Sequence, residues 1–412
     1  MSFIKNLLFT VATILIFALL YLGAIEMFLR MNERKMAHHL YNWRSFHVAD
    51  GNTGWSMEPY AAGYVETWNG LIHTSINSMG ARDREYAAQK GPDTRVLFLG
   101  DSFLYDNAYN FEEMYKSVTE FRLRRAGYEA EIVNAGTNGY GTDQELLFYQ
   151  SKGKALKPDI TVLHIYVGND IRDNAAGLFA EMMRAPTEKP YFTLNEGKTD
   201  IILKNHPYKG PLAKSFVDPY NDPMRINGYE PFRFMCLRSL LLHEVKLNLL
   251  WEYRLAPLFG LAHKEDEGKS DAFDKAYGPL WTKTPSDKWK EAFLLTHLII
   301  KKLKAEVEKD GGKFGVVIIP KREALEPQAA GPNQPYYLSV EDDLEPFLRN
   351  EKIPYMRLYH PFSQVNGKYA VLYEGGVHWN GAGHAVAAHA VSNWLAETFP
   401  IKKGAATDWK FD

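Results

Sequence analysis

The sequence predicts an α/β protein in which a parallel sheet lies between two layers of helices. Two observations support this prediction. Short apolar runs rich in β-branched residues alternate with helical patterns, and the first three runs end in loops that contain glycine. The composition, 46% hydrophobic and 24% charged over 412 residues, is that of a globular chain with ample core for one large domain or two.

The regular elements follow one another along the main part of the chain. Buried strands are predicted at 95–100, 131–134, 158–167, 314–320 and 355–358. Helices are predicted between them, at 111–127, from 142, from 286 to a stop at Gly311-Gly312, at 339–349 and from 380. Five strands joined in this way predict a three-layer α/β/α domain with a parallel, flavodoxin-like five-stranded sheet.

The N-terminal segment predicts a membrane anchor. Residues 6–25 are twenty consecutive residues without a charge, which is enough helix to cross a hydrocarbon core. A cleaved signal peptide would have a shorter apolar region and a clearer small-x-small cleavage site. Three basic residues between positions 30 and 35 outnumber Lys5, and by the positive-inside rule this count favours a cytoplasmic main domain.

The chain is therefore divided into three parts. Residues 1–30 form the anchor, and residues 31–94 form an accessory β segment with alternating runs at 63–68 and 71–75. Residues 95–400 form the main domain, interrupted by an insertion at about 176–285 that we expect to cover the site. Within the insertion, a helix is predicted from about 234 to 253.

Several classes of function have little support in the sequence. A net charge of −2 and a pI near 6.7 give no basic footprint for nucleic acid. The single Cys236 excludes an internal disulfide and a thiolate metal cluster. No P-loop or H-E-x-x-H motif is present, and the glycines at 136, 139 and 141 reverse the spacing of a dinucleotide fingerprint, so no cofactor and no metal are predicted. Nothing in the pattern specifies an oligomeric state.

Four loops supply the parts for acyl transfer at one edge of the sheet. Ser102 follows the first strand and is the candidate nucleophile; Gly139 and Asn169 follow the second and third strands, and His378 lies near the C-terminus. A serine hydroxyl needs a base in hydrogen-bond reach and donors for the oxyanion that forms. Taken alone, Asp101-Ser102 is better explained as the N-cap of the next helix.

These residues and their order resemble the SGNH (GDSL-type) hydrolase family. The resemblance covers about 95–170 and 286–398, and the segment 77–85 looks like the lead-in of membrane-anchored members. It implies that Ser102 attacks an ester carbonyl while His378 accepts and later returns the proton. It also implies that the amides of Ser102 and Gly139, with the side chain of Asn169, hold the oxyanion.

The sequence departs from the family before the histidine. Members usually carry an aspartate two or three residues earlier, and here those positions are Gly376 and Gly375. Glu374 lies one residue further back and has a longer side chain, so it is a candidate to orient His378. The alternative is a Ser–His dyad completed by a backbone carbonyl.

The sequence therefore predicts a serine esterase that acts through an acyl-enzyme on an acylated small molecule, glycan or lipid. Two alternatives remain open: a glycan O-acetyltransferase, and a non-catalytic glycan-binding relative, which the missing aspartate permits. On orientation the resemblance opposes the charge count, because anchored members tend to act on envelope carbohydrate or lipid. We follow the resemblance and expect an extracytoplasmic main domain.

Overall fold

The computed structural model describes residues 2–36, 40–41, 46–67, 69–87, 89–183, 186–213, 216, 280–325, 336–366, 373–374 and 378–404. The chain divides into two units, Met1–Tyr41 with Asp218–Asp274 and Asn42–Val217 with Lys275–Asp412. In the first unit the described elements are helix α1 (Ser2–Met36) and strand β1 (Leu40–Tyr41). The helix predicted at about 234–253 lies outside the described residues.

Helix α1 contains a segment that is long and apolar enough to cross a membrane. This segment, Lys5–Ile25, has a mean hydropathy of 2.5 and none of it is buried in the protein. Signal sequences near an N-terminus also meet these two criteria, so the segment is described as an apolar N-terminal helix.

The second unit is built on a parallel sheet of five strands. Its spatial order is β7 (Ala130–Gly136), β6 (Thr94–Gly100), β8 (Ile160–Tyr166), β11 (Lys313–Ile319) and β12 (Tyr355–Arg357). Each neighbouring pair is parallel. Counted along the chain this order is 2-1-3-4-5, which is the flavodoxin-like arrangement. The predicted fold class is confirmed.

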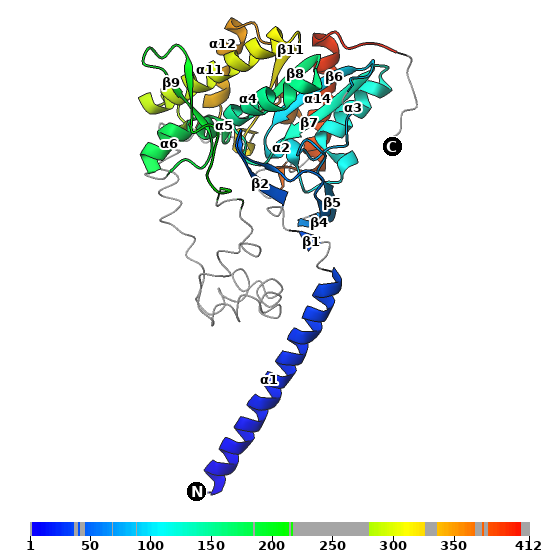
Figure 1. The fold of residues 1–412 in the computed structure, drawn as a ribbon, viewed down its shortest axis with the longest axis vertical. Helices are drawn as coiled ribbons and strands as arrows, with labels where there is room; N and C mark the ends of the chain where they lie inside the picture. Colours follow the sequence, from blue (N-terminus) through cyan, green and yellow to red (C-terminus); the bar gives the residue numbers. More distant parts are fainter. Residues whose placement is uncertain are drawn as a thin grey trace. The chain divides into compact units, whose positions relative to one another are not determined.

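Helices cover both faces of the sheet (Figure 1). Along β6, Leu97 and Leu99 face one core while Val96 and Phe98 face the other, as the two-residue period of a strand requires. The first core is closed by α4 (Thr142–Ser151), α5 (Asp170–Asn174), α11 (Asp287–Lys309) and α12 (Ser339–Asn350). The second is closed by α3 (Tyr115–Arg125), α13 (Tyr359–Asn366) and α14 (Gly381–Thr398).

Short elements surround this three-layer body. Antiparallel pairs are formed by β2 (His47–Asp50) with β3 (Gly54–Met57), β4 (Ala62–Thr67) with β5 (Gly70–Ser75), β9 (Tyr191–Leu194) with β10 (Ile201–Lys204), and β13 (Tyr373–Glu374) with β14 (His378–Trp379). Short helices are α2 (Ser102–Tyr105), α6 (Ala176–Met183), η2 (Phe111–Glu113), η3 (Gly153–Leu156) and η7 (Arg322–Leu325).

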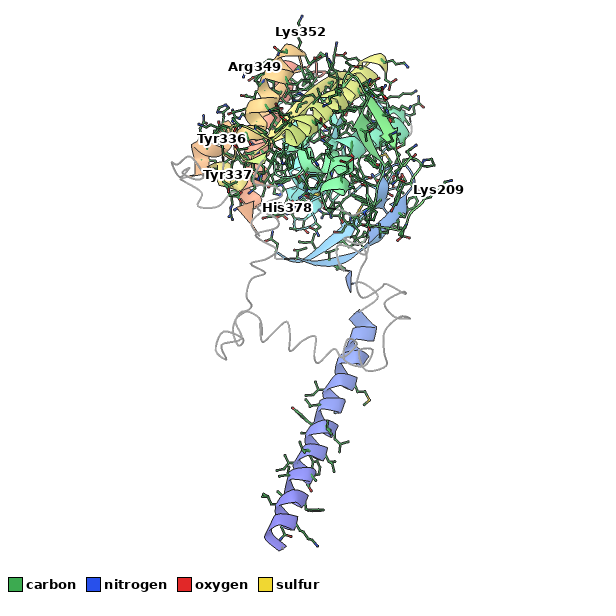
Figure 2. The ribbon with its side chains drawn as sticks, turned by 90° about the vertical axis from the view of Figure 1, so that its left-hand side faces the viewer. Lys209, Tyr336, Tyr337, Arg349, Lys352 and His378 are labelled. Atoms are coloured by element: carbon green, nitrogen blue, oxygen red, sulfur yellow. The ribbon has the colours of Figure 1, made fainter. Side chains whose placement is uncertain are left out.

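The two ends of the sheet carry different residues. Lys352 precedes the amino end of β12, and His378 lies at the opposite end of the same unit (Figure 2). His378 is thus at the end where the parallel strands finish, which is where ligands bind in open α/β sheets.

Candidate active site

Ser102 is the first residue of α2, the short helix that follows β6. Asp101 caps this helix, because its carboxylate accepts a hydrogen bond of 2.9 Å from the Phe103 N–H. The turn needs a glycine before it, since a Cβ on Gly100 would lie 2.7 Å from the Leu104 side chain. The N-cap interpretation of Asp101 and the position predicted for Ser102 therefore describe the same turn.

His378 reaches this turn from the C-terminal part of the chain. Its Nε2 lies 2.8 Å from Ser102 Oγ. The neighbouring Trp379 is buried and packs edge-on against Phe103 and Phe362, with ring centroids 5.0 and 5.6 Å apart. This packing holds β14 beside α2. It brings the His378 imidazole to the Ser102 hydroxyl although the two residues are far apart in the sequence.

The environment of His378 favours its neutral form. Burial lowers its pKa, the charge of Asp106 opposes this effect, and His384 adds to it. A neutral imidazole at neutral pH can accept a proton from a hydroxyl, as a general base must.

Asp106 and His384 form a buried pair near the two residues. His384 Nε2 lies 2.6 Å from Asp106 Oδ2, and its Nδ1 accepts a hydrogen bond of 3.1 Å from the Tyr115 N–H. Nδ1 accepts, so the ring proton is on Nε2 and faces the carboxylate. Burial raises the pKa of Asp106, and the neighbouring His384 outweighs this effect and holds that pKa below its ordinary value. These two contacts hold His384 at the start of α14 and give it a structural role.

Glu374 is opposite His378 in the two-stranded ribbon of β13 and β14. Its backbone is described, whereas its side chain and residues 375–377 lie outside the described part of the structure. That Glu374 orients the imidazole therefore stays a prediction.

The loop after β7 lies directly beside the turn of Ser102. The Thr137 N–H donates to the Gly100 carbonyl at 3.1 Å. A Cβ on Gly136 would lie 2.3 Å from Leu104 Cβ, so glycine is required for the loop and α2 to approach. Asn134 holds the start of the loop, where its Oδ1 accepts from the Gly136 N–H at 2.9 Å.

Gly139 ends this loop with φ +71°, in the left-handed region that favours glycine. The indole Nε1 of Trp55 donates to the carbonyl of Asn138 at 2.9 Å and so fixes the peptide that carries the Gly139 N–H. A Cβ on Gly139 would lie 2.9 Å from the ring of Phe216. Trp55 belongs to β3, and no pattern in the sequence had singled it out.

Asn169 follows β8 and turns its amide toward the cap of α2. Its Nδ2 lies 3.5 Å from Asp101 Oδ2. Burial raises the pKa of Asp101 to about 7, against the hydrogen bonds from Phe103 and Asn169. Burial also raises the pKa of two nearby carboxyls, Asp170 and Glu145, well above their ordinary values.

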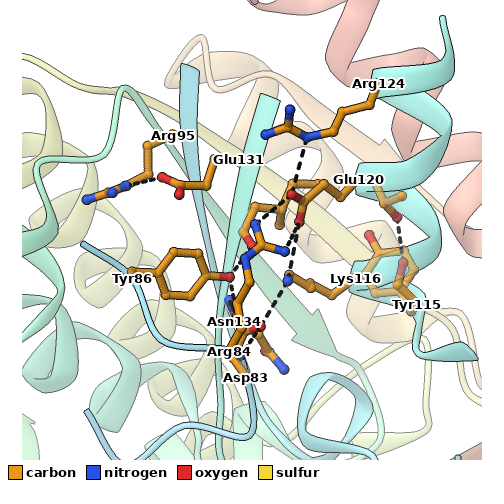
Figure 3. Close-up of polar contacts among 12 residues, drawn as sticks. Asp83, Arg84, Tyr86, Arg95, Tyr115, Lys116, Glu120, Arg124, Glu131 and Asn134 are labelled. Carbon is orange, nitrogen blue, oxygen red and sulfur yellow. Dashed lines mark hydrogen bonds and ion pairs between the residues drawn. The ribbon is translucent and has the colours of Figure 1, made fainter. Parts of the chain in front are cut away.

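A network of buried charges supports β7 from behind the site (Figure 3). Asp83 Oδ2 accepts from the Asn134 N–H at 2.7 Å, and Asp83 Oδ1 lies 2.9 Å from Lys116 Nζ. Lys116 also contacts Glu120 at 3.3 Å, and Arg84 reaches the same carboxylate at 2.6 Å. The segment 77–85, identified as a lead-in, thus attaches directly to the strand that carries Asn134.

A cavity of about 410 Å³ opens beside Gly139. Trp55, Phe179 and Phe216 contribute aromatic rings to its wall, and neither Ser102 nor His378 lines it. In the part of the chain that the structure describes, no group of three or more His, Cys, Asp or Glu residues is placed to hold a metal ion.

Fold and site together define a parallel α/β protein with a serine–histidine pair at the carboxyl edge of its sheet. No protein-family model matches the sequence, and no curated protein matches it. Solved structures to which the chain is similar include an acetyl xylan esterase, AlAXEase, with 12% identity and a TM-score of 0.38 over 73% of this chain and 98% of that one. TesA has 12% identity and a TM-score of 0.36 over 74% of this chain and 98% of its own.

A third similar structure is a catalytic mutant of an acetylxylan esterase from Geobacillus stearothermophilus. It has 11% identity and a TM-score of 0.37 over 76% of this chain and 98% of the esterase. At these identities and TM-scores the similarity identifies neither a family nor an activity, so the function is argued from the site.

Proposed function

We propose that this chain is an SGNH-type carboxylic ester hydrolase that acts through an acyl-enzyme on an O-acylated carbohydrate or lipid. The observation that carries the proposal is the 2.8 Å contact between Ser102 Oγ and His378 Nε2. This is the distance at which a base can take the hydroxyl proton as the oxygen attacks.

In the first half-reaction, Ser102 Oγ bonds to the ester carbonyl carbon while its proton passes to His378. The backbone N–H groups of Ser102 and Gly139 and the side chain of Asn169 stabilise the oxyanion. His378 then donates the proton to the departing alcohol oxygen, which leaves the acyl group on Ser102. In the second half-reaction water attacks the acyl carbon and gives a proton to His378. His378 returns this proton to Ser102 Oγ as the acyl–Oγ bond breaks, which releases the acid and regenerates the free serine.

The test is hydrolysis of p-nitrophenyl acetate by the full-length protein in detergent. We expect turnover that Ser102→Ala lowers by about 10³-fold or more. Ser151→Ala is the matched control, because that hydroxyl donates to the Leu147 carbonyl on helix α4, away from the site. A folded wild-type protein that binds glycans and hydrolyses no ester would favour the non-catalytic relative. Transfer of acetyl to an added glycan acceptor in preference to water would favour the O-acetyltransferase.

We also propose that Glu374 orients His378. The support is its place opposite His378 in the β13–β14 ribbon, where the backbones of the two residues are paired. Glu374→Gln should then lower kcat severely while the protein stays folded by circular dichroism. Wild-type turnover in this variant would favour a dyad completed by a backbone carbonyl.

The remaining proposals concern the arrangement of the chain. We propose that residues 1–30 anchor the protein, that 31–94 form an accessory β segment, and that 95–400 form the hydrolase domain with an insertion at about 176–285. We propose an extracytoplasmic hydrolase domain. Protease added to intact cells should degrade it, and its protection until the membrane is permeabilised would place it in the cytoplasm.

A further inference from the structure

The cavity beside Gly139 is large compared with a two-carbon acyl group. Its volume is about 410 Å³, within the range of small-molecule pockets. If one carbon with its hydrogens occupies roughly the ~30 Å³ of one water molecule, acetyl fills about 60 Å³ and octanoyl about 240 Å³. The cavity therefore has room for a chain of medium length.

The wall of the cavity is suited to an apolar group. Trp55, Phe179 and Phe216 supply ring surface. Ala176 and Ala180 of α6 also line the cavity, and their small side chains occupy little of it. Burial of a methylene chain against such a wall lowers the free energy of binding in proportion to the apolar area removed from water.

The cations of the wall are already matched by acidic partners. The Arg172 guanidinium bonds the Asp173 carboxylate at 2.5 and 2.9 Å. Lys189 Nζ, which is buried, lies 2.7 Å from Asp143 Oδ1 and 2.9 Å from Gln144 Oε1. Glu188 also lines the cavity, so the wall has no excess of positive charge to attract an anionic ligand.

The position of the cavity relative to the reacting groups selects which half of the ester it holds. In the proposed reaction the leaving alcohol oxygen must face His378 Nε2, because that nitrogen returns the proton to it. His378 does not line the cavity, whereas Gly139, the proposed oxyanion donor, does. In the tetrahedral intermediate the oxyanion faces the Gly139 N–H and the leaving oxygen faces His378. The acyl carbon is therefore the substituent left to enter a cavity that borders Gly139 and not His378.

We infer that the cavity lined by Trp55, Phe179, Phe216 and Gly139 binds the acyl chain of the substrate, and that the preferred esters carry a medium-length chain rather than acetyl. This inference rests on the proposed function and narrows it. It also gives the accessory segment a role, since Trp55 of β3 closes the acyl site from outside the hydrolase domain.

The experiment compares p-nitrophenyl esters of two, four, six and eight carbons on the full-length protein in one detergent. Each fully buried methylene is expected to raise kcat/KM by about fourfold, so burial of about three of the six additional methylenes already makes octanoate exceed acetate by roughly 50-fold. Ala180→Trp, which puts a ring into the cavity, should lower the octanoate-to-acetate ratio of kcat/KM by about tenfold or more. Glu181→Trp introduces the same ring at the next position of α6, where the residue does not line this cavity, and should leave the ratio unchanged.

The outcomes separate this inference from the proposed function. Hydrolysis of acetate that depends on Ser102, with no gain for longer chains, overturns the acyl site and leaves the esterase standing. An unchanged ratio in Ala180→Trp overturns the acyl site as well. Absence of any hydrolysis that depends on Ser102 overturns both. If Ala180→Trp does not fold, Ala176→Leu makes the same comparison with a smaller addition to the same wall.

Discussion

The hydrogen bond from Trp55 of β3 to the Asn138 carbonyl predicts that this indole controls the direction of the Gly139 N–H, the proposed oxyanion donor. In a trans peptide the C=O and the following N–H point in opposite directions, so the bond to Asn138 O also sets the direction of the Gly139 N–H. Trp55→Phe keeps an aromatic ring in the buried site and removes the donor. The Asn138 carbonyl then loses a partner, and the peptide is free to rotate.

The expected size of the effect has an upper and a lower bound. Loss of one oxyanion donor lowers kcat by about 10²–10³-fold. A donor that is present and misaligned should lower kcat by less. We therefore expect Trp55→Phe to lower kcat on p-nitrophenyl acetate by roughly tenfold or more. A buried carbonyl left without its donor costs about 1–3 kcal/mol of stability, which denaturant unfolding measures.

Trp394→Phe is the matched control for this prediction. Trp394 is buried on α14 and packs on Phe399, with ring centroids 5.4 Å apart, in the core behind the sheet. The control should lose stability to a similar extent and keep its kcat. Wild-type kcat in Trp55→Phe would refute the reasoning, because the Gly139 peptide would then hold its direction without the indole.

Further predictions concern pH and the buried charges. Burial lowers the pKa of His378, so kcat/KM should rise with pH through one ionisation below about 6.5 and stay flat above it; an inflection above pH 7 would contradict this assignment. Lys116→Met leaves two buried carboxylates, Asp83 and Glu120, without their shared cation and should lower the free energy of unfolding by about 3–5 kcal/mol in denaturant titrations. Burial raises the pKa of Glu145, so the stability linked to this carboxyl is present below its unfolded pKa of about 4.3 and is lost as pH rises toward the folded value. Glu145→Gln cannot ionise and should reduce the loss of thermal stability between pH 5 and pH 8. An unchanged pH dependence would show that folding does not raise the pKa of Glu145.

The sheet could be predicted from the sequence because its central strands, such as β6 and β8, are buried on both faces. Such strands are nearly continuous apolar runs, as in 95–100 and 158–167, and the glycine loops after them mark their carboxyl ends. Helix α13 was not predicted, because it spans only eight residues with a proline at its third position. The predicted helix at 111–127 is interrupted: η2 and α3 are separated by Met114, whose backbone is extended.

Helix α4 shows where the pattern of apolar residues misleads. Its apolar residues include Leu146, Leu147 and Tyr149, and a helix with a single core face would turn its acidic residues toward solvent. In the structure Asp143 and Glu145 are buried as well, because α4 is also packed against α11 and the β9 strand of the insertion. A single sequence does not show that a second layer covers the polar face of a helix.

In the candidate site, too, local patterns predicted single residues and did not predict the contacts between distant segments. Ser102 followed from the end of a strand, whereas its meeting with His378 depends on packing between Trp379 and Phe103 that no local pattern encodes. The Asp106–His384 pair and the Trp55 hydrogen bond join segments far apart in the chain. Contacts of this kind become visible only once the fold is assembled.

The central claim is that Ser102 is a nucleophile activated by His378. It is tested most directly by treating the full-length protein with a fluorophosphonate, in which the serine oxygen bonds to phosphorus as fluoride leaves, and mapping the adduct by mass spectrometry. The account predicts one adduct, on the peptide that contains Ser102, and its loss in His378→Gln. Labelling of a different serine, or ester turnover by a protein whose Ser102 stays unlabelled, would contradict it.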